Sequence, residues 1–216
     1  MEEINKNYCN IYLVRHGETE WNVLKMTQGQ TNSELTENGI EQAKEAAKKF
    51  KDIKFDAIFS SDLTRAYRTA EIIKLDRDII IQTSKLLRER NYGRFEGKHS
   101  DEFREILKDK ILERQSVADH EYSSFKLAPD VETDDELVTR FIIQLREIAV
   151  AYPNKTVLVV SHGGCIRNFL TKIGYMTRKE LPSGSFKNAG YVDFFSDGVD
   201  FFIKEVIGIV KPKGGE

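Results

Sequence analysis

The sequence predicts an α/β fold of three layers, α/β/α, around a mostly parallel central sheet. Short apolar segments rich in β-branched residues alternate along the chain with segments whose apolar residues recur at helical spacing. The segment KTVLVVS (155–161) is almost wholly apolar, which is typical of a strand buried on both faces in the middle of a parallel sheet. We find no repeat or low-complexity linker in the 216 residues, so we expect a single domain over 1–216.

Three strands and two helices alternate in the first part of the chain. The expected strands cover 10–15, 55–61 and 78–82, and the expected helices cover 36–50 and 62–74. Thr36 precedes the first helix, and its hydroxyl is a suitable N-cap. Ser61 or Asp62 is expected to cap the second helix in the same way.

The second part of the chain begins with a less regular insertion. Residues 84–132, with a short helix capped by Ser100, are expected to form a cap over one end of the sheet. A helix at 133–152 follows, and Thr133 and Glu136 have the spacing of a capping box. The remaining elements are a strand at 155–161, a helix at 164–173 and strands at 190–196 and 200–210. Ser196–Asp197–Gly198 predicts a hairpin between the last two strands.

Composition excludes several classes of partner. Lys and Arg number 33 against 35 Asp and Glu, so the net charge of −2 favours neither nucleic acid nor a membrane surface. The two cysteines, Cys9 and Cys165, lie far apart and form no C-x-x-C zinc motif, so we expect reduced thiols. No apolar run approaches the roughly 18 residues of a membrane span, and the first ten residues are polar. We therefore expect a soluble cytoplasmic protein.

Polar and charged side chains follow the predicted strands at their carboxyl ends, where ligands bind in open parallel sheets. Strand by strand, these residues are Arg15, His16, Gly17 and Glu18; Ser60, Ser61, Asp62 and Arg65; Arg88, Glu89, Arg90 and Tyr92; and Ser161, His162, Gly163 and Gly164. Two histidines, several arginines and a glutamate can therefore meet in one crevice. A helix that begins after Gly163 would add backbone N–H donors for an anion.

Such a set of residues suits phosphoryl transfer. A phosphate monoester needs fixed donors around its oxygens, a nucleophile, and an acid for the leaving oxygen. A neutral imidazole can attack phosphorus, and no metal is required where arginine and a second histidine supply the positive charge. Each residue alone can also be explained without a catalytic role: a histidine that is hydrogen-bonded within the core, a solvated arginine, or a glutamate in a loop. The prediction therefore depends on the joint pattern.

Four segments resemble the motifs of the histidine phosphatase superfamily, the phosphoglycerate mutase-like family. They are LVRHGETEWN (13–22), FSSDLTRAYRTA (59–70), LLRERNYGRFEGK (86–98) and VLVVSHGGCIR (157–167), in the family's order within roughly 10–195. The resemblance implies that His16 becomes phosphorylated, that Arg15, Arg65 and His162 complete a phosphate pocket, and that Glu89 is the proton donor. It also implies that Asn22, Gln28, Gly29, Gly163, Arg90 and Tyr92 bind phosphate or substrate.

The resemblance implies a metal-independent phosphatase acting on a small phosphorylated metabolite, with no cofactor. The runner-up is a 2,3-bisphosphoglycerate-dependent phosphoglycerate mutase. Family mutases carry a longer insertion after the third motif, a longer C-terminal tail, and often a basic residue where this chain has Met26. Those departures favour hydrolysis. The runs LRER, QGQ and SSDL look most like the fructose-2,6-bisphosphatase-related branch and its broad-specificity bacterial relatives.

Other readings have weaker support from the residues. The rival that is not an enzyme is a phosphate- or phosphoprotein-binding module, which usually lacks the nucleophile or the acid. A cysteine phosphatase is rejected because Arg167 follows Cys165 by only two positions. Arg68 is expected in a surface ion pair, and His99 and His120 in exposed loops. The chain is expected to be a monomer or a homodimer.

Overall fold

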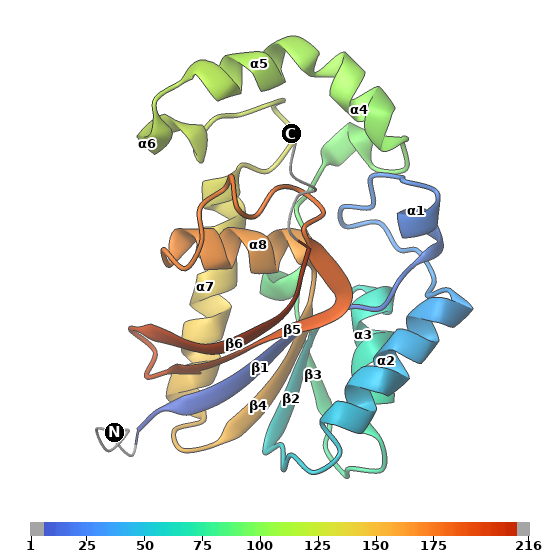
Figure 1. Cartoon of the computed structure of the whole chain (residues 1–216), viewed down its shortest axis with the longest axis vertical. Coiled ribbons are helices and arrows are strands. Elements are labelled where there is room, and N and C mark those ends of the chain that lie inside the picture. The colour runs from blue at the N-terminus through green and yellow to red at the C-terminus, as the bar shows by residue number, and fades with distance from the viewer. Residues whose placement is uncertain (1–6, 211–216) are drawn as a thin grey trace.

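A six-stranded sheet in the order β3-β2-β4-β1-β5-β6 forms the middle layer (Figure 1). The computed structural model describes residues 7–210. The strands are β1 (Cys9–Arg15), β2 (Ala57–Ser61), β3 (Ile81–Ser84), β4 (Thr156–Ser161), β5 (Phe186–Ser196) and β6 (Phe201–Ile209). β3, β2, β4 and β1 run parallel, and β5 and β6 are antiparallel to their neighbours. The prediction of a mostly parallel sheet is confirmed.

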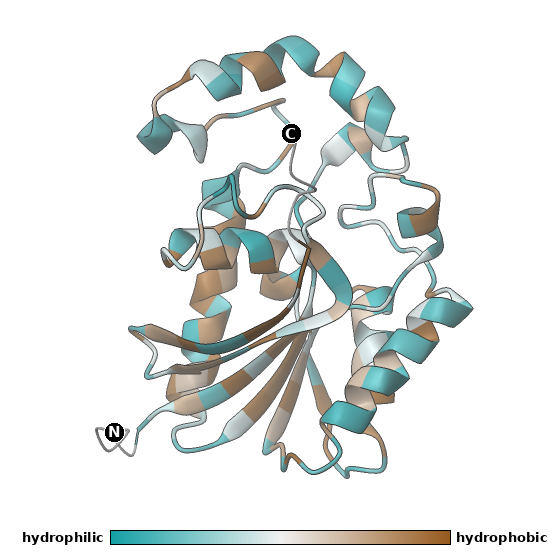
Figure 2. Ribbon diagram, in the orientation of Figure 1, coloured by the Kyte–Doolittle hydropathy of each residue, from teal (hydrophilic) through white to brown (hydrophobic). Residues whose placement is uncertain are grey.

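Helices cover both faces of the sheet. α2 (Glu37–Lys49) and α3 (Thr64–Lys74) lie on one face, and α7 (Asp134–Ala151) and α8 (Gly163–Lys172) lie on the other (Figure 1). Figure 2 shows hydrophobic residues along the central strands and a largely hydrophilic outer surface on α2. The sheet is therefore buried between two helical layers, as the three-layer prediction requires.

Side chains along the central strands point alternately to the two faces of the sheet, and they form one hydrophobic core on each face. In β4, Val157 and Val159 face the α7–α8 side, whereas Leu158 and Val160 face the α2–α3 side, and all four are fully buried. Successive strand side chains point to opposite faces, so a strand covered on both sides must be apolar throughout. This requirement explains the continuous apolar run that places β4 inside the sheet.

The segment 84–132 folds mainly into short helices beyond the carboxyl ends of the parallel strands (Figure 1). They are η1 (Lys85–Leu87), η2 (Gly93–Phe95), α4 (Ser100–Ile106), α5 (Lys108–Ser116) and α6 (Asp119–Tyr122). A separate apolar cluster, built around Phe95, Leu107, Ala128 and Val131, holds this segment together. A further short helix, α1 (Glu20–Val23), lies between β1 and α2 along the chain.

Several predicted element boundaries were wrong. The third strand covers Ile81–Ser84 instead of 78–82, because pairing with β2 begins at Ile81 and Ile80 remains 85% exposed. β5 begins at Phe186 instead of 190. Its pairing with β6 is irregular between Phe186 and Tyr191, but Phe186 still pairs with Ile209, so the strand starts earlier than expected. The pattern of apolar residues does not record which neighbour a strand pairs with.

The predicted helix caps were partly wrong. Thr36 caps α2, and Thr133 and Glu136 form the capping box of α7, as predicted. α3 instead begins after Leu63 without a side-chain cap, and His99 rather than Ser100 caps α4. Asp62 is not available to α3 because its carboxylate accepts two hydrogen bonds from Arg88.

Both cysteines, Cys9 and Cys165, are free and buried. Among residues 7–210, no helix combines the length and the apolar composition needed to cross a membrane.

Candidate active site

His16 and His162 are neighbours because β1 and β4 pair side by side. The parallel register matches Arg15 with Ser161, so the next residue of each strand is a histidine at the same edge of the sheet. The backbone N–H of His16 donates to the Ser161 carbonyl at 3.0 Å, which extends the pairing by one step. The two imidazole rings lie edge to face with their centroids 5.2 Å apart, and both are buried.

The His16 ring is held with its Nε2 atom as the basic nitrogen. Nδ1 lies 2.7 Å from the carbonyl oxygen of Gly17, and a carbonyl can only accept, so Nδ1 carries the hydrogen. Burial lowers the pKa of His16 well below its ordinary value, and the charges of Arg65 and Arg15 lower it further. At neutral pH the ring is therefore neutral with a lone pair on Nε2, which is the form that attacks phosphorus.

Gly17 is required by close packing of backbone against backbone. A Cβ at this position would lie 2.3 Å from the carbonyl oxygen of Gly39 in α2. The Gly17 N–H also donates to the hydroxyl of Thr69 in α3 at 3.1 Å. The turn that carries His16 is therefore fixed against both helices on this face of the sheet.

Arg65, which is buried, and Arg15, which is half-buried, bring two guanidinium groups to the histidine pair. Arg65, in the first turn of α3, donates to the carbonyls of Thr31 and Gly29 at 2.8 and 2.7 Å. Arg15 donates to the Phe186 carbonyl. Burial lowers the pKa of Arg65 to about 10 and also lowers the pKa of Arg15, while the nearby Glu89 carboxylate raises both. Arg65 therefore remains positively charged at neutral pH.

Several polar atoms around the rings are buried without a hydrogen-bond partner in the described part of the chain. They are Arg15 Nε, Arg65 Nε, and both ring nitrogens of His162. An unpaired buried polar atom costs about 1–3 kcal/mol, so such a concentration is typical of a binding site. Because both arginine atoms are donors on cationic groups, the ligand that suits them is a compact anion with several oxygens.

Glu89 lies at the N-terminus of α8, across from the arginines. Its Oε2 accepts a hydrogen bond from the Gly164 N–H at 2.9 Å, and its Oε1 accepts one from the Arg90 N–H at 2.8 Å. Arg15 packs beside the same helix end, because a Cβ on Gly163 would lie 3.0 Å from Arg15 Nε. The structure thus brings Glu89 and Gly163 together with the predicted phosphate pocket.

Three predicted residues lie between β1 and α2, and two of them, Asn22 and Gly29, are hydrogen-bonded to residues that hold the site. Asn22 Oδ1 accepts hydrogen bonds from the Thr19 N–H at 3.1 Å and from Asn188 Nδ2 at 3.2 Å. Gln28 is buried, and its Oε1 lacks a partner within residues 7–210. Gly29 adopts a φ of 52° and supplies one of the carbonyls that hold Arg65.

Arg90 and Tyr92 are placed at the junction of the 84–132 segment with α7. The Arg90 guanidinium binds the Glu132 carbonyl at 2.7 Å and the Asp134 carboxylate. Burial lowers the pKa of Arg90, but Tyr92 and Asp134 outweigh it and raise the pKa overall. The Tyr92 ring packs against Phe103, with centroids 5.5 Å apart. The predicted contacts of these two residues with substrate stay a prediction.

Sequence reasoning missed Asn188, Thr69 and Arg140. Asn188 Nδ2 donates to the His16 carbonyl at 3.1 Å as well as to Asn22, although it lies 172 residues from His16. Thr69 follows Arg65 by one helical turn, a spacing that was available as a signal. Arg140, one side chain among many on α7, contacts the backbone that carries Glu89.

Three other predictions concerned residues outside the site. Arg68 forms the expected surface ion pair with Glu71, at 3.0 Å. His99 and His120 are exposed as expected, but they lie at the N-cap of α4 and within α6 instead of in loops.

Comparison with known proteins identifies the family. A model described as "Histidine phosphatase superfamily (branch 1)" matches residues 11–205, a range that contains the histidine pair, both arginines and Glu89. The chain belongs to the histidine phosphatase superfamily. The resemblance inferred from the four motifs is therefore confirmed at the level of the family.

Two relatives of this histidine phosphatase illustrate the range of the family. A Bacillus subtilis protein named uncharacterized phosphatase PhoE is 38% identical over 163 residues, which cover 76% of each chain. An Escherichia coli protein named probable phosphoglycerate mutase GpmB is 37% identical over 159 residues, which cover 72% of each chain.

Solved structures agree with the fold. Bacillus stearothermophilus YhfR superposes with a TM-score of 0.81 at 30% identity, covering 94% of this chain and 98% of that one. A phosphoserine phosphatase of Entamoeba histolytica, solved with 3-phosphoglyceric acid, superposes with a TM-score of 0.77 at 28% identity, covering 93% and 97%.

Proposed function

We propose that this histidine phosphatase hydrolyses small phosphomonoesters through a phosphohistidine on His16, without a metal ion. The observation that supports this most is the state of the His16 ring. It is buried and neutral, and the Gly17 carbonyl leaves Nε2 as its basic atom, next to two guanidinium groups. A nucleophile beside fixed positive donors is what phosphoryl transfer requires.

In the first half-reaction, His16 Nε2 attacks phosphorus while the ester P–O bond breaks. Glu89, in its acid form, gives its proton to the leaving oxygen, and the alcohol departs. Arg15, Arg65 and His162 stabilise the charge on the non-bridging oxygens of the transferring group. The products of this step are the alcohol, a phosphohistidine and the Glu89 carboxylate.

In the second half-reaction, water replaces the alcohol. The Glu89 carboxylate takes a proton from the water as its oxygen attacks phosphorus, and the P–N bond to His16 breaks. Inorganic phosphate leaves, and His16 and Glu89 return to their starting forms. One carboxyl group thus acts as acid and then as base, and no outside reactant besides water is needed.

The 84–132 segment is proposed as the cap that selects the alcohol part of the substrate. It lies beyond the carboxyl ends of β1 and β4, and Glu89, Arg90 and Tyr92 all belong to it (Figure 1). Because a relative was solved with 3-phosphoglyceric acid and is named a phosphoserine phosphatase, small phosphorylated acids are the first substrates to test.

The second candidate function is a phosphoglycerate mutase, favoured by the relatives named for that activity. Phosphate release from a panel of phosphomonoesters, with and without EDTA, separates the two. The panel includes 3-phosphoglycerate with and without 2,3-bisphosphoglycerate. Release of free phosphate supports the phosphatase. Interconversion of phosphoglycerates with little hydrolysis identifies a mutase, and no reaction with any ester favours a binding module.

A cytoplasmic location is part of the proposal. Its support is that Cys9 and Cys165 are both free, which suits a reducing compartment. Fractionation of cells that contain the tagged protein tests it.

A further inference from the structure

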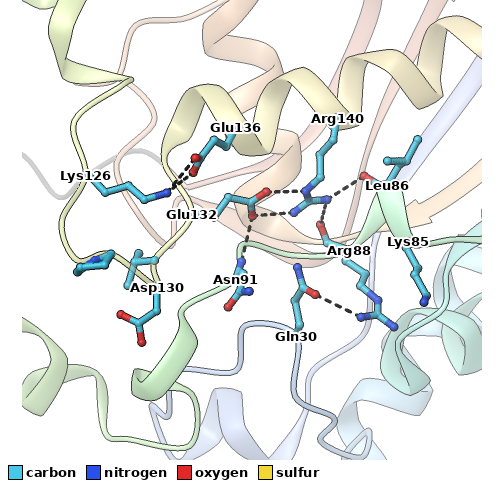
Figure 3. A pocket seen from close by; sticks show the side chains of 12 residues that line it. Gln30, Lys85, Leu86, Arg88, Asn91, Lys126, Asp130, Glu132, Glu136 and Arg140 are labelled. Carbon is cyan, nitrogen blue, oxygen red and sulfur yellow. Dashed lines mark hydrogen bonds and ion pairs between the residues drawn. The ribbon is translucent and has the colours of Figure 1, made fainter.

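Arg140, on α7, binds main-chain carbonyls of Glu89 and of the residues just before it. Arg140 Nη1 donates to the carbonyls of Leu86 and Arg88 at 2.8 and 2.6 Å, and its Nη2 donates to the carbonyl of Glu89 at 2.9 Å. Figure 3 shows the guanidinium reaching from α7 into this bend of the chain. Arg140 therefore donates to three of the four carbonyls from Leu86 to Glu89, and Gln30 Nε2 adds a longer hydrogen bond to the Glu89 carbonyl at 3.2 Å.

Within residues 7–210, the segment 86–89 pairs with no strand. β3 ends at Ser84, and the chain continues through η1 into extended backbone at Arg88. Its other carbonyl contacts also come from side chains: Ser161 Oγ binds the Leu87 carbonyl at 2.8 Å, and Cys165 Sγ lies 3.1 Å from the Arg88 carbonyl. Without a ladder of backbone hydrogen bonds, side-chain donors determine where Glu89 lies.

Glu132 orients the Arg140 guanidinium. Its two carboxylate oxygens accept from Arg140 Nε and Nη2 at 2.6 and 2.9 Å, which is a bidentate ion pair. Glu132 Oε2 also accepts from the Asn91 N–H at 3.0 Å, so the same pair ties the chain on the far side of Glu89 (Figure 3). Burial lowers the pKa of Arg140, but the hydrogen bond to Glu132 contributes to a net rise, so the guanidinium stays charged.

Apolar packing covers only part of this segment. Leu86, Arg88, Asn91 and Glu132 line the pocket drawn in Figure 3 together with Arg140. Leu87 is fully buried in the main core and fixes the start of the segment, whereas Arg88 and Glu89 are only half-buried, so hydrogen bonds matter more for the position of these two residues. Loss of the guanidinium would therefore let the Glu89 backbone move instead of leaving it held by neighbours.

We propose that Arg140 is a positioning residue for proton transfer: through the main chain it holds the Glu89 carboxyl at the N-terminus of α8. The inference rests on the proposed role of Glu89 as proton donor. Arg140 does not need to touch the substrate. A displacement of about 1 Å at a reacting group can lower a rate about 10²-fold, so this anchor has a measurable effect on the chemistry.

The test uses esters whose leaving groups differ in their need for a proton. An alkyl phosphate requires the acid, whereas 4-nitrophenyl phosphate releases a stable phenolate without it. The quantity compared is kcat/KM, because it includes only the steps up to cleavage of the ester bond. Arg140→Met is expected to lower kcat/KM about 10²-fold for the alkyl ester and less than about 5-fold for the aryl ester.

Arg77 provides a matched control. Its guanidinium also donates to backbone carbonyls, those of Phe50, Lys51 and Ile53 at 2.6, 3.1 and 3.1 Å, near the amino end of β2 and away from the histidine pair. Arg77→Met removes a comparable anchor. It is expected to lower stability while changing kcat/KM for the two esters by the same factor.

The outcomes separate the inference from the function on which it rests. Equal losses for both esters in folded Arg140→Met would overturn the positioning role. Wild-type protein that hydrolyses neither ester would instead overturn the proposed phosphatase. Glu89→Gln must also lower kcat/KM more for the alkyl ester than for the aryl ester. Equal losses of kcat/KM for the two esters would show that Glu89 is not the acid. If Arg140→Met does not fold, Arg140→Lys is measured, with a smaller split in the same direction expected.

Discussion

Glu89 and Gly164 approach so closely that a side chain at residue 164 would displace the carboxyl group of Glu89. A Cβ built on Gly164 would lie 2.3 Å from Glu89 Oε1, while the Gly164 N–H donates to the other carboxylate oxygen at 2.9 Å. The same residue therefore binds the proposed proton donor and leaves room for it. A substitution here acts on the carboxyl group and not on the core.

Gly164→Ala is expected to lower kcat/KM for an alkyl phosphate at least about 10-fold, because the methyl group displaces the flexible end of Glu89. The free energy of unfolding should stay the same or rise by up to about 1 kcal/mol, since alanine favours helix over glycine. Steady-state kinetics and urea unfolding check the two parts. Unchanged kinetics in the folded variant would contradict the assignment of Glu89.

His16→Ala is expected to remove activity by at least about 10⁴-fold, because no other group replaces the nucleophile. Wild-type protein mixed with phosphate-labelled substrate and quenched in alkali should retain label on the protein, and His16→Ala should not. His120→Ala removes an exposed histidine and is the control for general effects. Full activity in His16→Ala would contradict the proposed mechanism.

Glu89→Gln is expected to lower kcat/KM for alkyl esters about 10²- to 10⁴-fold, the range for loss of general acid catalysis. Binding of inorganic phosphate should change little, because Arg15, Arg65 and His162 keep their places. Competitive inhibition by phosphate, measured with the aryl ester, checks this. Loss of phosphate binding in a folded variant would show that Glu89 supports the pocket itself.

Stability is expected to fall as the pH drops below about 6.5, the ordinary pKa of histidine. Burial lowers the pKa of His16 and His162 well below that value, so both stay neutral while folded and take up protons once unfolded. The unfolded state then binds more protons, and each histidine lowers the free energy of unfolding by up to about 1.4 kcal/mol per pH unit. Urea unfolding at pH 7.5, 6.5 and 5.5 measures the slope. His162→Asn should reduce that slope, whereas His120→Asn, a change at an exposed position, should not.

Activity is expected to survive EDTA, because Arg15 and Arg65 already supply two positive charges beside the reacting phosphate. Phosphate release after dialysis against EDTA checks this. Loss of activity that added Mg²⁺ or Mn²⁺ restores would mean that a metal ion takes part.

The central residues of the site were predictable because they stand at the carboxyl ends of two buried strands. Arg15 ends β1 and His16 follows it, and His162 and Gly163 follow β4, so a local pattern of apolar residues locates them. The boundaries of β3 were not predictable in the same way. Ile79 and Ile80 are as apolar as Ile81, but only Ile81 begins the pairing with Ile58 of β2.

The sequence by itself determined the type of fold, the buried central strands and the chemical groups at their carboxyl ends. Hydrophobic periodicity and residue type are local properties, and they need no knowledge of the rest of the chain. Only the tertiary structure decided that His16 lies against His162, that Asn188 joins the His16 loop, and that Arg140 anchors Glu89. These contacts join residues 51 to 172 positions apart, or depend on the register of two strands. Packing of the whole chain sets such distances, and no local pattern encodes them.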